Sequence, residues 1–209
     1  MLIGIVGFIG SGKDTVGNFL IEDFDFKHDS FANPLKDAVS IIFGWDRIML
    51  QGSTKEDREE REMVDEYWSE VCDMEITPRL VLQLFGTESV REVFGENVWS
   101  ASLIKRWKQA GKPNTVVTDC RFMNEIRAIS DNGGEVWLVK RGENPTWYGE
   151  YVKLMREENW YEIGNLREKG FFPHVSETDW IGYDNFNAII QNNQTLGHLR
   201  NNVWNLISK

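Results

Sequence analysis

The segment GFIGSGKDT, residues 7–15, has the residue types and spacing of a phosphate-binding loop. It matches the pattern G-x-x-x-x-G-K-[ST], except that Asp14 stands where the pattern has Ser or Thr. Glycines let backbone N–H groups close around phosphate oxygens, and Lys13 supplies a mobile cation for the β- and γ-phosphates. The segment follows the apolar run LIGIVGF and precedes an amphipathic stretch, which is the context such a loop requires. These residues predict a phosphate site rather than an ordinary glycine-rich turn.

Asp14 bears on how a metal ion is held. In many P-loop proteins the residue after the lysine binds Mg²⁺ directly through a hydroxyl. Nucleoside monophosphate kinases of the adenylate kinase type often lack that hydroxyl and carry Thr at the next position, as Thr15 does here. Asp14 in place of Ser or Thr, with Thr15 next to it, therefore indicates a small-molecule kinase. Asp14 either binds a magnesium-coordinated water or pairs with a cation of the cleft, and its residue type allows both.

A carboxylate and a guanidinium follow a second apolar run. Asp119 and Arg121, in TDCR, fall at the carboxyl end of the expected strand 114–120. Open α/β sheets bind ligands at that edge. A structural ion pair is the alternative, but the two charges together favour a nucleotide cleft.

Weaker signals lie in the middle of the chain. Lys36 sits in the first turns of an expected helix that follows an apparent short strand. Arg79 and Gln83 are four residues apart and share a helix face. The pair Gly86-Thr87 is expected to break that helix and expose its backbone. None of these signals is specific alone.

Strand and helix patterns alternate around these residues. Short apolar runs predict buried strands at residues 2–8, 114–120, 135–141 and 185–192. Helices are expected at residues 14–24, 33–44, 77–95, 97–111, 121–134 and 195–207. Asn33 is the candidate cap of the second helix, with Pro34 in its first turn and Gly44 at its end. The alternation predicts an α/β fold with a mostly parallel sheet and helices on both faces.

Two segments stand outside this alternation. Residues 53–75 hold ten acids and three bases, so they carry −7 of the net charge of −10. Their apolar residues share one face and predict an acidic surface helix with one packed side. These residues are Met63, Val64, Tyr67, Trp68 and Val71. Residues 142–172 are aromatic and irregular and include Arg156 and Arg167.

Composition excludes several classes of protein. The 209 residues carry no basic stripe, so no nucleic-acid partner is expected. Cys72 and Cys120 form neither a disulfide framework nor a zinc site. The chain shows no leader and no apolar stretch long enough to span a bilayer, so we expect no membrane partner and a soluble protein of the cytoplasm.

The motifs taken in order are more specific than any one of them. GKDT is followed by PLKDA, R-L-x-x-Q-x-x-G-T, N-x-W, D-x-R with Glu125 downstream, and H-x-S-E at 174–177. This order resembles the phage deoxynucleoside monophosphate kinase family. The resemblance runs through most of the chain and is weakest at 45–77 and 144–172.

The resemblance implies a single P-loop kinase domain over residues 1–209, with an acidic helical insert at about 45–77 and a lid at about 142–172. It implies transfer of the ATP γ-phosphate to a deoxynucleoside monophosphate, giving ADP and a diphosphate for viral DNA precursors in the host cytoplasm. Mg²⁺ is the implied metal, and a homodimer is suggested. Which monophosphate is accepted stays open among dGMP, dTMP and modified dCMP.

The resemblance also assigns roles to residues. The implied catalytic residues are Lys13 and Arg121. ATP is expected at Gly10, Ser11, Gly12, Lys13, Asp14, Thr15 and Arg141, with Mg²⁺ at Thr15 and, through water, at Asp14. Lys36, Arg79 and Arg121 are expected to bind the acceptor phosphate, and Gln83, Gly86, Thr87, Trp99, Asp119 and Glu125 to shape its pocket. At least one of Arg141, Arg156 and Arg167 is expected to reach the transferring phosphoryl group.

Three other functions fit parts of the pattern. Another small P-loop kinase, such as dephospho-coenzyme A kinase, shares the loop and the helical insertions. A P-loop ATPase or GTPase switch shares the loop, but the chain has neither an N-K-x-D signature nor an apolar strand ending in Asp-Glu. A stand-alone monophosphate-binding module is the third.

Overall fold

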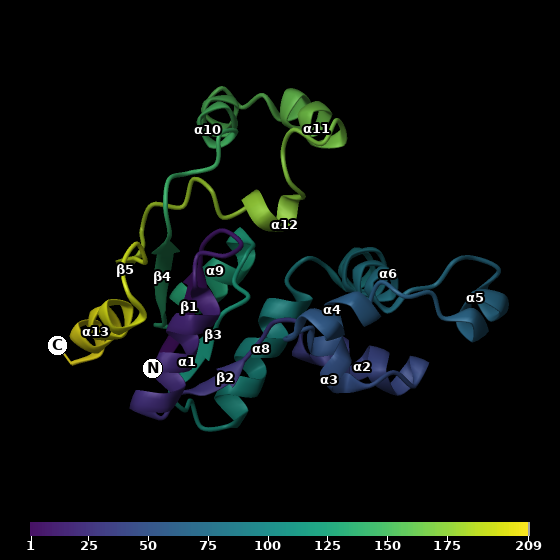
Figure 1. Cartoon of the computed structure of the whole chain (residues 1–209), viewed down its shortest axis with the longest axis horizontal. Coiled ribbons are helices and arrows are strands. Elements are labelled where there is room, and N and C mark those ends of the chain that lie inside the picture. Colours follow the sequence, from purple (N-terminus) through teal and green to yellow (C-terminus); the bar gives the residue numbers. More distant parts are fainter. Residues whose placement is uncertain (209) are drawn as a thin grey trace. The chain divides into compact units, whose positions relative to one another are not determined.

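In the computed structural model, which describes residues 1–208 except for the side chains at 87 and 88, five parallel strands form one sheet (Figure 1). The strand order is β2-β3-β1-β4-β5. The strands are β1 (Leu2–Val6), β2 (Lys27–Asp29), β3 (Thr115–Val117), β4 (Glu135–Lys140) and β5 (Ala188–Gln191). Ile3 of the central strand pairs with Val116 on one side and Glu135 on the other. All strands therefore end at one edge, where the loop after β1 begins.

Helices cover both faces of this sheet. Helix α1 (Lys13–Phe24) packs beside α13 (Leu196–Ile207) on one face, as Figure 1 shows. Ile3 and Ile5 of β1 and Trp137 of β4 point into the buried cluster beneath these helices. Helix α9 (Met123–Ser130) contacts β1 and β4 on the other face, where Ile129 reaches Gly4. The predicted α/β class, with helices on both faces, is confirmed.

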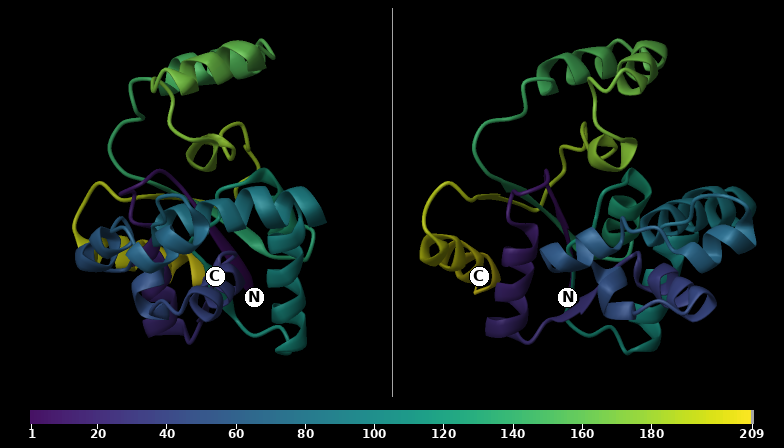
Figure 2. Two further views of the ribbon diagram at one scale, coloured as in Figure 1. Left: turned by 90° about the vertical axis from the view of Figure 1, so that its right-hand side faces the viewer. Right: turned by 45° about the vertical axis from the view of Figure 1, so that its right-hand side comes forward.

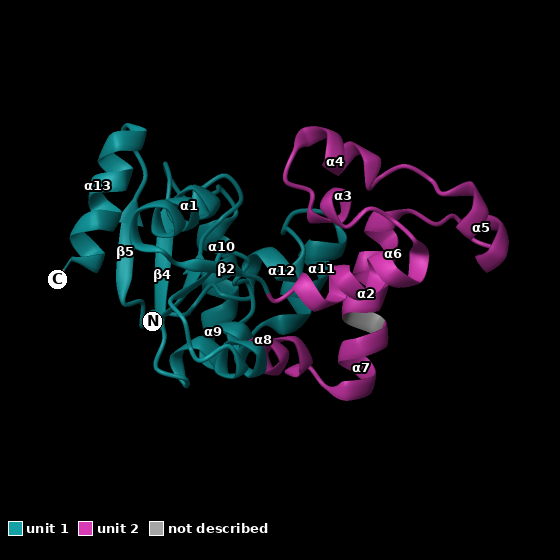
Figure 3. Ribbon diagram, turned by 90° about the horizontal axis from the view of Figure 1, so that it is seen from below, with its two compact units in different colours: residues 1–30, 104–209 teal, residues 31–103 magenta. Residues whose placement is uncertain are grey.

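The chain divides into two compact units, which Figure 3 colours separately. Unit 1 comprises residues 1–30 and 104–209 and contains the sheet. Unit 2 comprises residues 31–103, and its elements are helical. They are α2 (Asn33–Phe43), α3 (Arg47–Gln51), α4 (Lys55–Glu60), α5 (Glu66–Cys72), α6 (Pro78–Leu84), the π-helix η1 (Phe85–Ser89) and α7 (Val90–Phe94). Helix α8 (Val98–Gln109) runs across the boundary in sequence.

The acidic segment 53–75 forms two short helices, so the prediction of one surface helix with a packed side is wrong. Thr54 begins α4 with a reciprocal capping box to Asp57, and Asp65 begins α5 by accepting from Trp68 N at 3.0 Å. These caps start separate helices and shift the apolar side chains off a common face. Trp68 packs in the core of unit 2, whereas Met63, Val64, Tyr67 and Val71 are exposed.

Two other local predictions for unit 2 need correction. The chain does not leave the helical path at Gly86-Thr87, because η1 continues α6 into α7 with wider hydrogen bonding. Gly86 is buried, and a Cβ there would lie 2.9 Å from Leu35 Cδ2, so the glycine permits close packing against α2. Asn33 is not the cap of α2: Ala32 holds that position, and Asn33 Oδ1 accepts from Arg47 at 3.1 Å.

Residues 142–187 of unit 1 hold three short helices. They are α10 (Tyr148–Arg156), α11 (Trp160–Glu168) and α12 (Val175–Thr178). Helices α10 and α11 contact one another and stand apart from the sheet, as Figures 1 and 2 show. No helix in the described part of the chain combines the length and apolarity needed to cross a bilayer.

Candidate functional site

The loop between β1 and α1 takes backbone conformations that glycine permits. Gly7 and Gly12 have φ angles of 149° and 101°. A Cβ on Gly7 would lie 2.4 Å from the carbonyl oxygen of Val139 in β4, and one on Gly12 would lie 2.4 Å from Asn192 Nδ2. The loop is therefore held closely between β4 and the residues after β5, and larger residues at these two positions would open it.

Lys13 folds back over this loop. Its Nζ donates to Gly7 O at 2.8 Å and to Phe8 O at 3.0 Å. Burial lowers the pKa of Lys13 most, and the positive charge of Arg121 lowers it further, while Glu177 and Asp14 oppose the shift. The positive charges of Lys13 and Arg121 thus repel one another, and a bound anion would reduce this repulsion.

Polar groups suited to phosphate oxygens gather beside the lysine. Ser11 Oγ is buried and has no hydrogen-bond partner among the described residues. Gly12 is the N-cap of helix α1 and has no side chain to cap the first turn. Uncapped N–H groups at a helix start bind anions, and the helix dipole favours negative charge there. The loop therefore fits the phosphates of a nucleotide.

Asp14 and Thr15 lie in the first turn of α1. Asp14 is exposed and Thr15 is partly buried. Carboxylate and hydroxyl oxygens suit a hard cation such as Mg²⁺. The described residues contain no cluster of three or more His, Cys, Asp or Glu that could hold a metal. These two residues would therefore hold Mg²⁺ only together with oxygens of water and phosphate.

Arg121 lies just after β3, at the edge of the sheet where the loop also lies. Its Nη1 donates to Glu177 Oε1 of α12 at 2.5 Å. Its backbone N donates to Glu125 Oε2 at 2.8 Å, and Phe122 N donates to the same oxygen at 3.0 Å. Asp119 Oδ2 accepts from Ser30 Oγ at 2.6 Å. Glu125 thus fixes the backbone that carries Arg121, and Glu177 orients the guanidinium.

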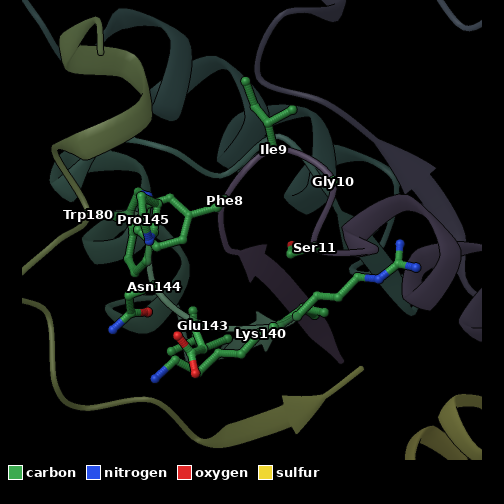
Figure 4. A pocket seen from close by; sticks show the side chains of 13 residues that line it. Phe8, Ile9, Gly10, Ser11, Lys140, Glu143, Asn144, Pro145 and Trp180 are labelled. Carbon is green, nitrogen blue, oxygen red and sulfur yellow. The ribbon is translucent and has the colours of Figure 1, made fainter. Parts of the chain in front are cut away.

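A pocket of about 160 Å³ opens beside the loop (Figure 4). Its lining includes the loop residues Gly10 and Ser11 together with Arg141, which follows β4. Phe8 and Trp180 lie together at one side, as Figure 4 shows, with ring centroids 4.9 Å apart. Three of the predicted ATP-binding residues therefore line one pocket.

The predicted acceptor residues of unit 2 form their own contacts. Lys36 Nζ donates to Gln51 Oε1 at 3.0 Å, and Arg79 pairs with Glu62 at 3.2 Å on the surface. Trp99 Nε1 donates to Gly86 O at 2.9 Å. Gln83 is exposed, and the side chain of Thr87 lies outside the described residues.

The predicted site residues are thus divided between the units. Unit 1 holds Gly10, Ser11, Gly12, Lys13, Asp14, Thr15, Asp119, Arg121, Glu125 and Arg141. Unit 2 holds Lys36, Arg79, Gln83, Gly86, Thr87 and Trp99.

Sequence reasoning missed Asn192 as a residue of the loop. Asn192 Nδ2 donates to Ser11 O at 2.9 Å, and its backbone N donates to Lys140 O at 2.7 Å. It follows β5, so the rule that ligands bind at the carboxyl ends of parallel strands could have identified it. The same rule identified Asp119 and Arg121.

Comparison with known proteins identifies a relative by sequence and a solved structure with a similar fold. No protein-family model matches the chain. A protein of Acanthamoeba polyphaga mimivirus named "Putative deoxynucleotide monophosphate kinase" is 30% identical over 154 residues, covering 67% of this chain and 72% of the relative. The solved structure of dephospho-CoA kinase from Campylobacter jejuni superposes with a TM-score of 0.50 at 14% identity, covering 99% of this chain and 95% of that one.

Proposed function

The chain belongs to the family of small P-loop kinases that includes the mimivirus relative, and from this premise we propose that it phosphorylates a deoxynucleoside monophosphate. The products are a deoxynucleoside diphosphate and ADP, and the reaction supplies DNA precursors. The family membership supports a kinase and does not single out the phage branch, since the relative is a mimivirus protein.

One observation carries the proposal. Lys13 Nζ lies on the carbonyls of the glycine loop, and the charge of Arg121 acts on it. A loop lysine and a strand-end arginine that influence one another through space suit a γ-phosphoryl group passing between donor and acceptor. The orphaned Ser11 Oγ supports a donor phosphate in the loop.

The chemistry follows from these charges. An oxygen of the acceptor monophosphate, already ionised near neutral pH, attacks the γ-phosphorus of ATP. The bond from that phosphorus to the bridging β-γ oxygen breaks, and ADP leaves with the electron pair. No general base is needed, so catalysis rests on alignment and on neutralising negative charge. Mg²⁺, held through Thr15 and through water at Asp14, would neutralise part of the charge on the phosphates.

Acceptor binding is proposed for the remaining predicted residues. Arg121, Lys36 and Arg79 bind the acceptor phosphate. Asp119, Gln83, Trp99, Gly86 and Thr87 shape the base and sugar pocket. Glu125 acts by holding the backbone of Arg121, because its carboxylate accepts the two N–H groups that follow Cys120.

A coupled ADP-release assay with a panel of acceptors tests the proposal. The panel holds each deoxy- and ribonucleoside monophosphate and dephospho-coenzyme A, with an arm that lacks any acceptor. We expect ADP release that depends on one or more deoxynucleoside monophosphates. Turnover of dephospho-coenzyme A alone would show that this compound, and not a deoxynucleoside monophosphate, is the substrate. Acceptor-independent ATP hydrolysis alone would support a nucleotide switch instead.

A further inference from the structure

One arginine of unit 2 lies against the end of α3, and a second is hydrogen-bonded to its backbone. The guanidinium of Arg61 rests on Gly52, whose φ is 68°: a Cβ built there would lie 2.4 Å from Arg61 Cζ. Arg79 N donates to Arg61 O at 2.9 Å, so the two residues are backbone neighbours across 18 positions of sequence. Arg61 and Arg79 are called the arginine pair below.

The arginine pair lacks a full set of partners. Arg61 Nε is buried and has no hydrogen-bond partner among the described residues. A buried donor without an acceptor destabilises the fold, and a charged one does so more strongly. Burial lowers the pKa of Arg61, and the charge of Arg79 lowers it further. A structural ion pair does not explain this arrangement, because it would give Arg61 an acceptor.

The nearby acids are already engaged. Asp57 Oδ2 accepts from Thr54 N at 3.0 Å as part of the cap of α4. Glu62 Oε1 lies 3.2 Å from Arg79 Nε, and both side chains of that pair are well exposed. An exposed ion pair contributes little to stability, so an incoming anion can displace Glu62 from Arg79.

The end of α3 also joins the arginine pair to Lys36. Lys36 Nζ donates to Gln51 Oε1 at 3.0 Å, and Gln51 is followed directly by Gly52, on which Arg61 rests. Lys36 and Arg79 are two of the residues proposed for the acceptor phosphate. Arg61 lies between them along this contact path, although neither motif nor resemblance singles it out.

We propose that Arg61 binds the 5′-phosphate of the acceptor nucleotide together with Arg79, an inference that rests on the proposed function. A phosphate monoester carries close to two negative charges, and a guanidinium binds two of its oxygens through parallel N–H groups. The phosphate replaces Glu62 as the partner of Arg79 and offsets the repulsion between the charges of Arg61 and Arg79. The acidic insert thereby contributes directly to substrate binding.

Steady-state kinetics of Arg61→Ala and Arg61→Lys test this role. Loss of a hydrogen bond to a charged group corresponds to roughly a 10- to 100-fold effect, so Arg61→Ala should raise the acceptor KM by about that factor. The ATP KM should stay unchanged. Arg61→Lys should restore little, because an ammonium does not reproduce the planar fork. Lys55→Ala, which removes one positive charge from an exposed side chain of the same insert, is the control and should leave both KM values unchanged.

Calorimetry without ATP separates this inference from the kinase proposal. Wild-type and Arg61→Ala proteins, each shown to be folded by thermal melting, are titrated with deoxynucleoside monophosphates and with inorganic phosphate. In one outcome the wild type binds a monophosphate without turning it over, while Arg61→Ala binds it more weakly. That result would contradict the kinase proposal and support the phosphate site. Equal binding and equal acceptor KM would overturn the role of Arg61 alone. Equal affinity of the wild type for inorganic phosphate and for the monophosphates would reassign the site to free phosphate. If Arg61→Ala does not fold, Arg61→Lys is titrated instead, and unchanged binding overturns the proposal.

Discussion

Arg121 and Glu177, 56 positions apart in sequence, are joined by a hydrogen bond of 2.5 Å between Nη1 and Oε1. Arg121 follows β3, and Glu177 belongs to α12, so the bond ties the segment after α11 to the edge of the sheet. Both charges act on Lys13: Arg121 lowers its pKa and Glu177 raises it. Glu177 therefore both orients Arg121 and moderates the repulsion between the two cations.

Replacing Glu177 with Gln should shift the pH dependence of turnover. The variant loses a group that raises the pKa of Lys13, so that pKa falls further below its ordinary value. Lys13 then loses its proton at lower pH, and the alkaline limb of the kcat profile moves to lower pH. Glu150→Gln on α10 is the control and should leave the limb in place. An alkaline limb that stays fixed in Glu177→Gln would show that Glu177 does not tune Lys13.

Replacing Lys13 with Met should remove activity without loss of stability. Loss of one electrostatic stabiliser of the transition state should lower kcat by at least ~10²-fold. A lysine whose folded pKa lies below its unfolded value destabilises the fold while it is charged, and this cost shrinks as pH rises from the folded pKa to the unfolded one. At neutral pH the Tm of Lys13→Met should equal or exceed that of the wild type. Near-normal turnover would remove the phosphate-loop assignment.

Replacing Arg121 with Ala should affect the acceptor more than ATP. The guanidinium is proposed to bind the acceptor phosphate, so acceptor KM and kcat should both worsen while the ATP KM changes little. Arg121→Lys should rescue poorly, because a point charge does not reproduce a bidentate fork. Initial rates over a grid of both substrate concentrations give the acceptor KM and the ATP KM separately. Equal damage to the ATP KM would reassign Arg121 to the donor side.

The four apolar strands and the loop could be read from local sequence because each is a short contiguous pattern. The apolar run before Asp119 became β3, and the glycine spacing placed Lys13 at the start of α1. The two short helices of the acidic segment were not predicted, because the caps at Thr54 and Asp65 compete with apolar periodicity and prevail. Gly86, in the π-helix, packs closely against Leu35, which is 51 positions away in sequence. A sequence pattern does not show such contacts.

The residues of the site also fall into those that the sequence predicted and those that it did not. Residues within a motif, such as Lys13 and Arg121, were identified by type and spacing. Asn192 was not, because its bond to Ser11 O spans 181 positions. Arg61 was not, because a buried donor without a partner is a property of the folded unit and leaves no pattern in the chain.

Asn192 offers a test of how the loop is held. Asn192→Ala removes the donor to Ser11 O and should lower the free energy of unfolding by about 1 kcal/mol, the usual contribution of one hydrogen bond. Asn192→Asp should cost more, because a carboxylate would face the Ser11 carbonyl and the bound phosphates. The ATP KM should rise in the order wild type, Ala, Asp. Asn201→Ala on the exposed side of α13 is the control. Unchanged ATP KM in both variants would show that the loop keeps its shape without Asn192.

The segment 142–172 is predicted to be a lid that closes over the phosphates and excludes water. Its helices α10 and α11 stand apart from the sheet in Figure 2, and Gly142, with φ of 66°, joins them to β4. Closing segments of this kind keep water from competing as phosphoryl acceptor. Hydrogen exchange should show slower exchange of residues 142–172 when a bisubstrate analogue of ATP and a monophosphate is bound.

Replacing each of the three arginines in or beside this segment with Ala should have a different effect. Arg141 lines the pocket beside the loop, so Arg141→Ala should slow phosphoryl transfer in single turnover while barely changing ATP affinity. Arg167 donates to Pro173 O at 3.0 Å and to Thr178 Oγ1 at 3.1 Å, so Arg167→Ala should lower the Tm more than kcat. Arg156 is exposed at the end of α10, and its variant tests whether that end reaches the phosphates on closure. Lys153→Ala, on the same helix, is the control. If ligand leaves exchange unchanged and all three arginine variants transfer phosphate at the wild-type rate, this segment is a fixed subdomain and other residues must exclude water from the donor site.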